Sequence, residues 1–215
     1  MGHRLSIWRR LGYGRAGVVA SGFTLILVTT LPADAHHVMG GRTPATLFEG
    51  FVSGLGHPVI GIDHLAFIVA VGLIAGLARL YTAMPAIFIA ASALGVALHV
   101  HGIDLPAAEL TVAASVLLAG VLIARGAIIH ATGWLAVFAV AGFFHGDAYG
   151  ESIAGAEPAP LLAYLAGLVV VQAMIAMAIA VLARGSAASA LRPRLAGAAI
   201  AGLGLAVLAG HIVPA

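Results

Sequence analysis

The chain contains no cysteine and no lysine, and it has few charged residues of any kind. Of its 215 residues 8% are charged, as 10 arginines against 8 acids. A soluble domain carries about 25% charged residues, so the composition excludes an ordinary water-soluble protein. Without cysteine there is no disulfide scaffold and no thiolate metal ligand. The chain has no basic patch or aromatic-basic stripe, so no nucleic-acid partner is expected.

The N-terminal segment has the features of a signal peptide. An apolar stretch, AGVVASGFTLILVTTL, ends near Ala33-Asp34-Ala35, which has the small-x-small form of a cleavage site, and four arginines precede it. We predict a signal peptide over residues 1–35 and a single transmembrane domain over residues 36–215; an uncleaved first transmembrane helix is the alternative. Cleavage would leave His36 and His37 at the mature N-terminus as a candidate weak capture site for a metal ion. In both cases the positive-inside rule places the following residues outside the cytoplasm.

Apolar runs separated by Pro, Gly and charged residues fill the rest of the chain. A transmembrane helix needs about 20 residues, and six runs can span a bilayer, some of them with flanking residues. A shorter run, Pro44–Gly56, includes Glu49 and three glycines, and is predicted to be re-entrant or interfacial. The sequence therefore predicts an all-α membrane helix bundle with six transmembrane helices plus this short segment. The six runs are Val59–Ala78, Met84–His99, Pro106–Ala124, Ala127–Phe144, Pro160–Ala183 and Leu195–Val213.

The stretch GHPVIGIDHLAFIVAVG places ionisable side chains inside an apolar segment. On an unbroken helix His57 and His64 would lie about 10 Å apart along the axis, too far for one ion. Pro58 suits a first helical turn, so we predict that the helix starts there and that His57 folds back toward Asp63 and His64. Asp63 is a candidate ligand or a carboxylate that orients the imidazole. Because intramembrane ionisable groups are costly and usually functional, a metal site is favoured over simple hydrogen bonding between helices.

Further histidines and acids occur at the ends of other apolar runs. HVHGID and FFHGDAYGES each combine imidazole with carboxylate, and both follow an apolar run. An acid in the first turn of a helix is also stabilised by the helix dipole alone. His130 stands apart and is interpreted as structural. The additional candidate ligands are His99, His101, His145, Asp147 and Glu151, with Asp104 beside them and with Glu109 and His211 as supporting residues.

The segment GFVSGLGHPVIGIDHLAFIVAVGLIAGL resembles the signature region of the HupE/UreJ family of small membrane proteins. The specific part is His57-Pro58-x-x-Gly61-x-Asp63-His64, and the later FFHGDAYGES is similar to a looser motif of that family. The leader, the histidines after it and the six-span plan agree with the resemblance. It implies a secondary permease for nickel or cobalt, a role for His57, Asp63 and His64 in transport, and a link to hydrogenase or urease maturation.

The chemistry of the candidate ligands agrees with transport of a divalent transition metal. Imidazole suits Ni, Co, Zn and Cu, and the absence of thiolate disfavours Cu(I) and closed structural zinc sites. Nickel is the first expectation and cobalt the second, as the transported ion and not as a permanently bound cofactor. No ATP-binding element occurs, and no enzymatic activity is predicted. The alternatives are an intramembrane zinc hydrolase, which needs three fixed ligands and a general base, and a non-transporting metal-binding accessory protein.

The arginines predict the topology in a bacterial inner membrane. If Pro44–Gly56 does not span and the mature N-terminus lies outside, five arginines fall in the cytoplasm and only Arg42 outside, as the positive-inside rule requires. The C-terminus then also lies outside. This topology places the candidate ligands toward the outer face, with Asp63 and His64 one to two turns deeper. The five cytoplasmic residues are Arg79, Arg125, Arg184, Arg192 and Arg194.

Overall fold

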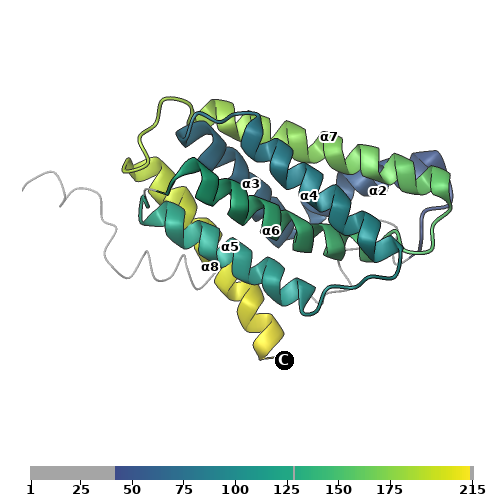
Figure 1. Ribbon diagram of the computed structural model, residues 1–215. Coiled ribbons are helices and arrows are strands. Elements are labelled where there is room, and N and C mark those ends of the chain that lie inside the picture. Colours follow the sequence, from purple (N-terminus) through teal and green to yellow (C-terminus); the bar gives the residue numbers. More distant parts are fainter. Residues whose placement is uncertain (1–41, 128, 214–215) are drawn as a thin grey trace, which may run out of the picture. The chain divides into compact units, whose positions relative to one another are not determined.

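The computed structural model describes residues 42–127 and 129–213. These residues form helices and contain no strand, which confirms the all-α prediction (Figure 1). The predicted signal peptide, His36 and His37 lie outside the described residues, and both predictions stay open. The helices are α2 (Leu47–Ile60), α3 (Ile62–Leu77), α4 (Ala83–Val100), α5 (Ala108–Ala124), α6 (Ala131–Glu151), α7 (Pro158–Ala183) and α8 (Leu191–Ile212).

Length and hydropathy give three or four candidate membrane spans among the described helices. The helices α4, α7 and α8 are each long and apolar enough, and α2 with α3 forms a fourth candidate that is bent by 81°. The apolar α5 has 17 residues and is shorter than a full span. The 21-residue α6 carries His145 and Asp147 in its buried C-terminal part. A multi-pass membrane protein is therefore supported.

The helices α2 and α3 pack one after the other along α7 and run in the same direction as it. Eighteen residues separate Gly54 from Gly72, whereas only twelve separate the α7 residues that they face, Tyr164 and Ala176. The chain between the two glycines therefore leaves the surface of α7 and returns to it. Small residues make this close backbone approach feasible in lipid. The contacts are Gly50 with Pro160, Gly54 with Tyr164, Gly72 with Ala176 and Gly76 with Ala180.

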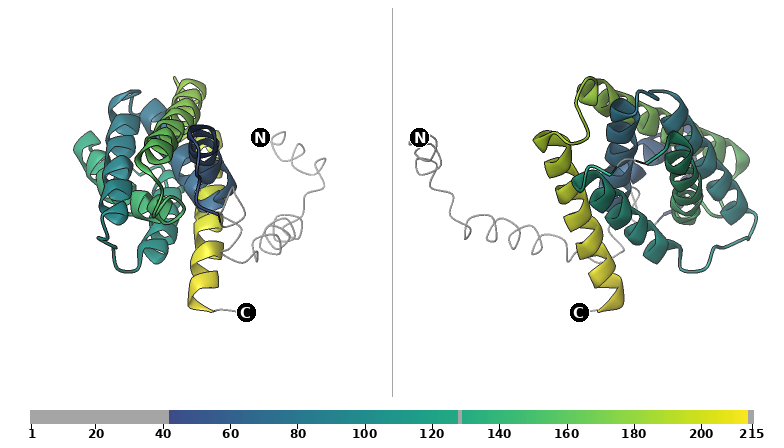
Figure 2. Two further views of the ribbon diagram at one scale, coloured as in Figure 1. Left: turned by 90° about the vertical axis from the view of Figure 1, so that its right-hand side faces the viewer. Right: turned by 60° about the vertical axis from the view of Figure 1, so that its left-hand side comes forward.

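Two further helix pairs complete the bundle. The helices α4 and α6 run parallel, because Gly142, Gly146 and Gly150 face Phe88, Ser92 and His99 in the same chain order. The helices α5 and α8 run antiparallel, because Gly120 and Gly204 of these helices face Ala201 and Leu117, respectively. The last turns of α8 extend past the neighbouring helices in every view (Figures 1 and 2).

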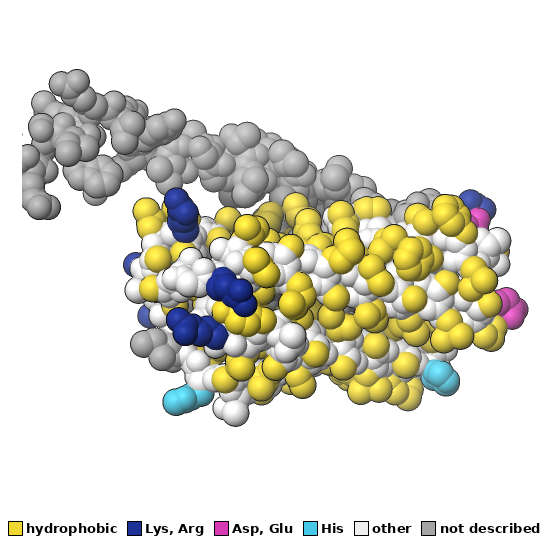
Figure 3. All heavy atoms as spheres, turned by 90° about the horizontal axis from the view of Figure 1, so that it is seen from above, with side chains coloured by type: hydrophobic (Ala, Val, Ile, Leu, Met, Phe, Trp, Pro, Cys, Tyr) yellow, Lys and Arg dark blue, Asp and Glu magenta, His cyan; other side chains and the backbone are white. Residues whose placement is uncertain are grey.

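Charges of opposite sign collect at opposite ends of the helices. Figure 3 shows basic side chains gathered mainly toward one end and carboxylates toward the other, where basic atoms also lie beside a carboxylate, with an apolar surface between the two ends. At the arginine end, the Arg184 guanidinium lies 4.7 Å from the centre of the Tyr81 ring, and Arg194 Nε donates a 2.9 Å hydrogen bond to the carbonyl of Ala124. The arginines that follow α3, α5 and α7 or begin α8 thus share one end, as the sequence predicted.

Candidate metal-binding centre

The helix pair α2 and α3 is bent at Gly61, as in a broken span or a re-entrant segment. The helix α2 begins with a capping box: the Thr46 hydroxyl accepts from the Glu49 N–H at 3.1 Å, and the Glu49 carboxylate accepts from the Thr46 N–H at 3.2 Å. It then continues through His57 and Pro58 to Ile60. The prediction that a helix starts at Pro58 is therefore wrong. Proline removes one backbone hydrogen bond from the helix interior, and the helix ends within three residues at Gly61 (φ −70°, ψ 99°).

The break turns two imidazoles toward each other in the interior of the bundle. His57 lies in the last turn of α2 and His64 in the first turn of α3, and their ring centroids are 5.6 Å apart. Because a metal–nitrogen bond is about 2.1 Å long, the centroids of two imidazoles on one ion lie at most about 6 Å apart. The two rings are therefore close enough to share an ion. A Cβ at Gly61 would stand 2.6 Å from Cδ2 of His64, so a larger residue at the break would displace the His64 ring.

The carboxylate of Asp63 lies in the first turn of α3, next to His64 in the chain. Asp63 and His64 are both buried, and Oδ1 of Asp63 accepts a hydrogen bond from the backbone N–H of His64 at 2.8 Å. An acid in the first turn of a helix is stabilised by the helix dipole, so the dipole of α3 offsets part of the cost of burying this charge. The approach of His57 to His64 was predicted, but it arises from the bend at Gly61 and not from a helix start at Pro58.

A third imidazole joins the group from α6. His145 is fully buried, and its Nδ1 lies 2.9 Å from Nδ1 of His64. The ring of Tyr149 packs against His64 and His57, with centroid distances of 4.4 and 5.2 Å. We call His57, Asp63, His64 and His145 the inner centre.

Hydroxyl groups hold the ring of His57. Its Nδ1 lies 2.9 Å from Oγ of Ser152 and 3.0 Å from the hydroxyl of Tyr164. The Tyr164 hydroxyl in turn donates to the carbonyl of Tyr149 at 2.8 Å. The imidazole of His57, which α2 carries, is thus held by groups from α6, from α7 and from the turn after α6.

A second group lies nearer the carboxylate end. Nδ1 of His99 is 3.1 Å from Oδ1 of Asp104 and 3.5 Å from Oδ1 of Asp147. Asp147 is almost fully buried and also accepts from the backbone N–H of Leu105 at 3.1 Å, whereas the Asp104 side chain is 75% exposed. We call His99, Asp104 and Asp147 the outer group; it connects a buried carboxylate with the surface.

Four of the predicted residues lie outside both groups. His101 is exposed, and its Nδ1 lies 2.7 Å from the carbonyl of Ala97 in its own helix. Glu109 and His211 pair with each other at 3.6 Å between α5 and α8. Glu151 is exposed at the end of α6. His130 is exposed at the start of α6, which agrees with its structural interpretation.

Aromatic side chains close the inner centre on the side of the arginine end. The ring of Phe67 lies 4.6 Å from His145, and Phe88 lies 5.7 Å from it. Phe138 packs edge-on against Phe67 at 5.9 Å. All three phenylalanines are buried, so the centre ends in an apolar layer.

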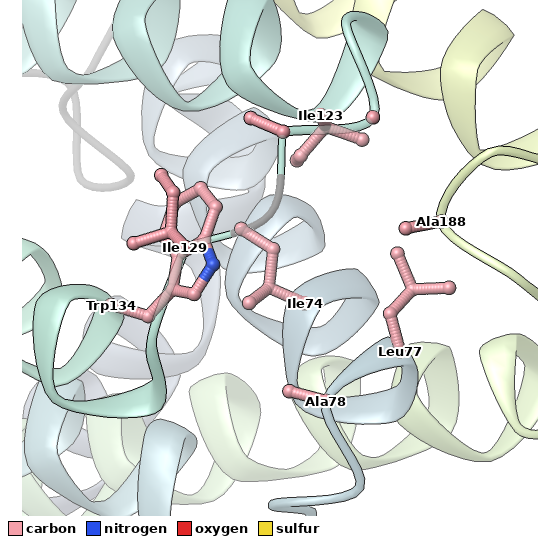
Figure 4. A pocket seen from close by; sticks show the side chains of 9 residues that line it. Ile74, Leu77, Ala78, Ile123, Ile129, Trp134 and Ala188 are labelled. Carbon is pink, nitrogen blue, oxygen red and sulfur yellow. The ribbon is translucent and has the colours of Figure 1, made fainter.

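Within residues 42–127 and 129–213, no three His, Asp or Glu side chains are already arranged to coordinate one ion. The cavity shown in Figure 4, lined by Ile74, Leu77, Ile123, Ile129 and Trp134 among others, is apolar and lies at the arginine end. It offers no metal-binding side chains. Ligand chemistry in the described residues is therefore concentrated in the inner centre and the outer group.

Sequence reasoning did not identify the side chains that hold the imidazoles. Ser115 and Tyr164 are polar residues inside long apolar runs, and a polar residue in such a run is itself a signal. Tyr149 and Ser152 both belong to the FFHGDAYGES stretch. Their roles depend on contacts between helices, which sequence spacing does not give.

Comparison with known proteins identifies the family. The family model described as HupE / UreJ protein matches residues 24–207, which include both groups of candidate ligands. The chain belongs to the HupE/UreJ family. It is similar to Protein HupE of Rhizobium leguminosarum bv. viciae, with 31% identity over 192 residues, covering 87% of this chain and 96% of that protein. No solved structure matches it.

Membership of the HupE/UreJ family confirms the resemblance deduced from the motif at His57–His64. The match extends over six of the seven described helices and most of α8. It includes the break at Gly61 and the α6 segment that contributes His145, so both halves of the inner centre belong to the part of the chain shared with the family. His211 lies beyond its end.

Proposed function

We propose that this HupE/UreJ protein is a secondary transporter that takes up a divalent transition metal, nickel in the first place and cobalt in the second. The observation that carries the proposal is the broken span, which turns His57, Asp63 and His64 into the bundle interior beside His145. Imidazole and carboxylate without thiolate suit such ions. Broken helices with polar residues at membrane depth are the usual form of a transporter binding site.

The two groups of ligands define an inward path. The outer group connects an exposed carboxylate, Asp104, with the buried Asp147. Both groups include a residue of α6, Asp147 and His145, which lie about 3 Å apart along the helix axis but on different faces of the helix. In this proposal an ion that leaves the outer group passes around the last turns of α6 to reach the inner centre. An incomplete ligand set also suits transport, because the ion must be released after it binds. The apolar layer of Phe67, Phe88 and Phe138 then acts as the barrier on the inner side, in the manner of a hydrophobic constriction.

The membrane potential supplies enough energy for accumulation. A charge that crosses a potential of about 100 mV gains about 2.3 kcal/mol, so a divalent ion gains about 4.6 kcal/mol. Since about 1.4 kcal/mol corresponds to a factor of ten, uptake by more than a thousandfold needs no ATP. The end that carries five arginines faces the cytoplasm in this proposal, and six spans result when α2 with α3 counts as one.

The inner membrane of a bacterium is the proposed location, with both mature termini outside the cytoplasm. A role in supplying metal for hydrogenase or urease maturation follows from the family resemblance. The ion is the substrate, and no permanently bound cofactor is proposed. The zinc-hydrolase alternative would need three fixed ligands and a general base, and no observation on the described residues favours it.

Uptake of radioactive nickel or cobalt into proteoliposomes that contain only this protein tests the proposal. We expect His57→Ala, Asp63→Ala and His64→Ala each to abolish uptake, because each removes a ligand or a group that orients one. His130→Ala is the matched control, since it removes an exposed imidazole far along α6 from the centre. Normal uptake by a well-inserted Asp63→Ala/His64→Ala double variant would rule out the inner centre as the transport site.

A further inference from the structure

We propose that Ser115 and His145 are positioning residues: they hold no ion themselves but fix the tautomer in which His64 presents Nε2 to the metal. This inference rests on the proposed function and assigns parts within its site. It replaces the prediction that His145 is a ligand. One series of hydrogen bonds, from Ser115 on α5 through His145 on α6 to His64 on α3, determines this tautomer.

The series of hydrogen bonds starts at a serine whose hydroxyl proton is already donated to a backbone carbonyl. Ser115 lies in α5, and its Oγ donates to the carbonyl of Val112 at 2.7 Å. The same Oγ lies 3.1 Å from Nε2 of His145. With its proton committed to Val112, the Ser115 oxygen acts as an acceptor, and Nε2 of His145 must donate to it. A neutral imidazole carries one N–H, so Nδ1 of His145 is left as an acceptor.

The hydrogen bond between His145 and His64 then determines which ring nitrogen of His64 carries the proton. Nδ1 of His145 lies 2.9 Å from Nδ1 of His64. Since Nδ1 of His145 accepts, Nδ1 of His64 donates. The neutral His64 ring then carries its lone pair at Nε2, the form in which an imidazole binds a metal. The hydrogen bond made by one ring nitrogen decides which nitrogen is available to the metal.

His57 is held in the same way by separate residues. The Tyr164 hydroxyl donates to the carbonyl of Tyr149 at 2.8 Å, and the Ser152 hydroxyl has acceptors in that carbonyl at 3.2 Å and in the Tyr164 hydroxyl at 3.1 Å. Because the hydroxyl protons of Tyr164 and Ser152 are both donated elsewhere, the two hydroxyl oxygens accept from Nδ1 of His57. The two imidazoles of the broken span thus share one tautomer, with lone pairs at Nε2.

The decisive measurement is the position of the ring protons. Nitrogen-15 NMR of the full-length protein with labelled histidine, in lipid nanodiscs without metal, distinguishes the two tautomers of each ring. We expect the proton on Nε2 of His145 and on Nδ1 of His64. A proton on Nδ1 of His145 in the unmutated protein would overturn the proposal without reference to any variant.

Variants of Ser115 connect the tautomer with metal binding. Loss of a group that orients a ligand costs about 10- to 100-fold in metal affinity, so Ser115→Ala should weaken Co²⁺ or Ni²⁺ binding by about tenfold and mix the tautomers of His145. Ser115→Thr keeps the hydroxyl, and its extra methyl has room in the apolar groove that Ser115 lines with Thr111 and Leu118. It should restore both readouts.

Ser92→Ala is the matched control. Ser92 is another helical serine whose hydroxyl donates to the carbonyl three residues earlier, that of Ile89, and it has no contact with the inner centre's rings through a hydrogen bond. Its removal should leave tautomers and affinity unchanged. Unaltered affinity in Ser115→Ala, or equal loss in Ser92→Ala, would refute the positioning role. Absence of uptake by the unmutated protein would refute the transport proposal instead, since the NMR and binding results do not depend on transport.

Discussion

Replacement of Gly146 by alanine tests the packing that brings α6 to its place in the bundle. The nearest atom to a Cβ at Gly146 would be the carbonyl oxygen of Ser92 on α4, and the carbonyl carbon and Cα of Ser92 would both stand 2.7 Å away, about 0.7 Å inside the 3.4 Å at which ordinary contact begins. The obstacle is backbone, so no rotamer change relieves it. The two helices must separate by a comparable distance, and the contacts between α4 and α6 loosen along their length.

The expected cost combines two opposed effects. Overpacking in a well-packed interior costs about 1–3 kcal/mol, whereas alanine is favoured over glycine in a helix by about 1 kcal/mol. Because the obstacle is backbone, the upper part of the overpacking range, about 2–3 kcal/mol, applies, and we expect a net loss of about 1–2 kcal/mol in the free energy of unfolding, measured by titration with SDS in mixed micelles. Because Gly146 lies between His145 and Asp147, metal uptake should also slow.

The control for this variant is Gly202→Ala in α8. A Cβ at Gly202 meets no atom within 4 Å, so this variant should be neutral or gain up to about 1 kcal/mol from helix propensity. If Gly146→Ala proved as stable as the unmutated protein, the close parallel packing of α4 on α6 would be refuted. Equal destabilisation by both substitutions would show that the effect is not specific to this interface.

Three further predictions concern topology and the residues outside the inner centre. Single cysteines at Ser186 and Ala154 in the cysteine-free chain should label from the cytoplasmic and the periplasmic side, respectively, with an impermeant maleimide; the reverse pattern would overturn the six-span topology. Glu109→Gln and His211→Gln should leave uptake near normal, because the two side chains pair with each other at 3.6 Å between α5 and α8. A strong loss of uptake in either variant would show that these residues take part in the path of the metal ion. Asp147→Asn should raise the metal concentration needed for half-maximal uptake, because His99 loses its buried charged partner, and an unchanged uptake curve would remove Asp147 from the outer group.

The sequence by itself determined the fold class and the family, and it named the candidate ligands of the broken span. Apolar runs separated by glycine, proline and charge can only be membrane helices, because every backbone group in lipid must find its partner within its own segment. The position of the arginines predicted which helix ends share one side. The motif from His57 to His64 also required a break, since on a straight helix the two rings would be about 10 Å apart.

The tertiary structure decided where the break lies and which distant side chains meet. Pro58 was an equally good helix start by its local preference, but the capping box at Thr46 begins α2 earlier and the chain bends at Gly61 instead. The approach of His145 to His64, and of Tyr164 to His57, depends on how closely glycine-containing faces of separate helices pack, and periodicity along one helix carries no information on that. For the same reason His101, adjacent in sequence to the outer group, turns back to its own helix and stays outside it.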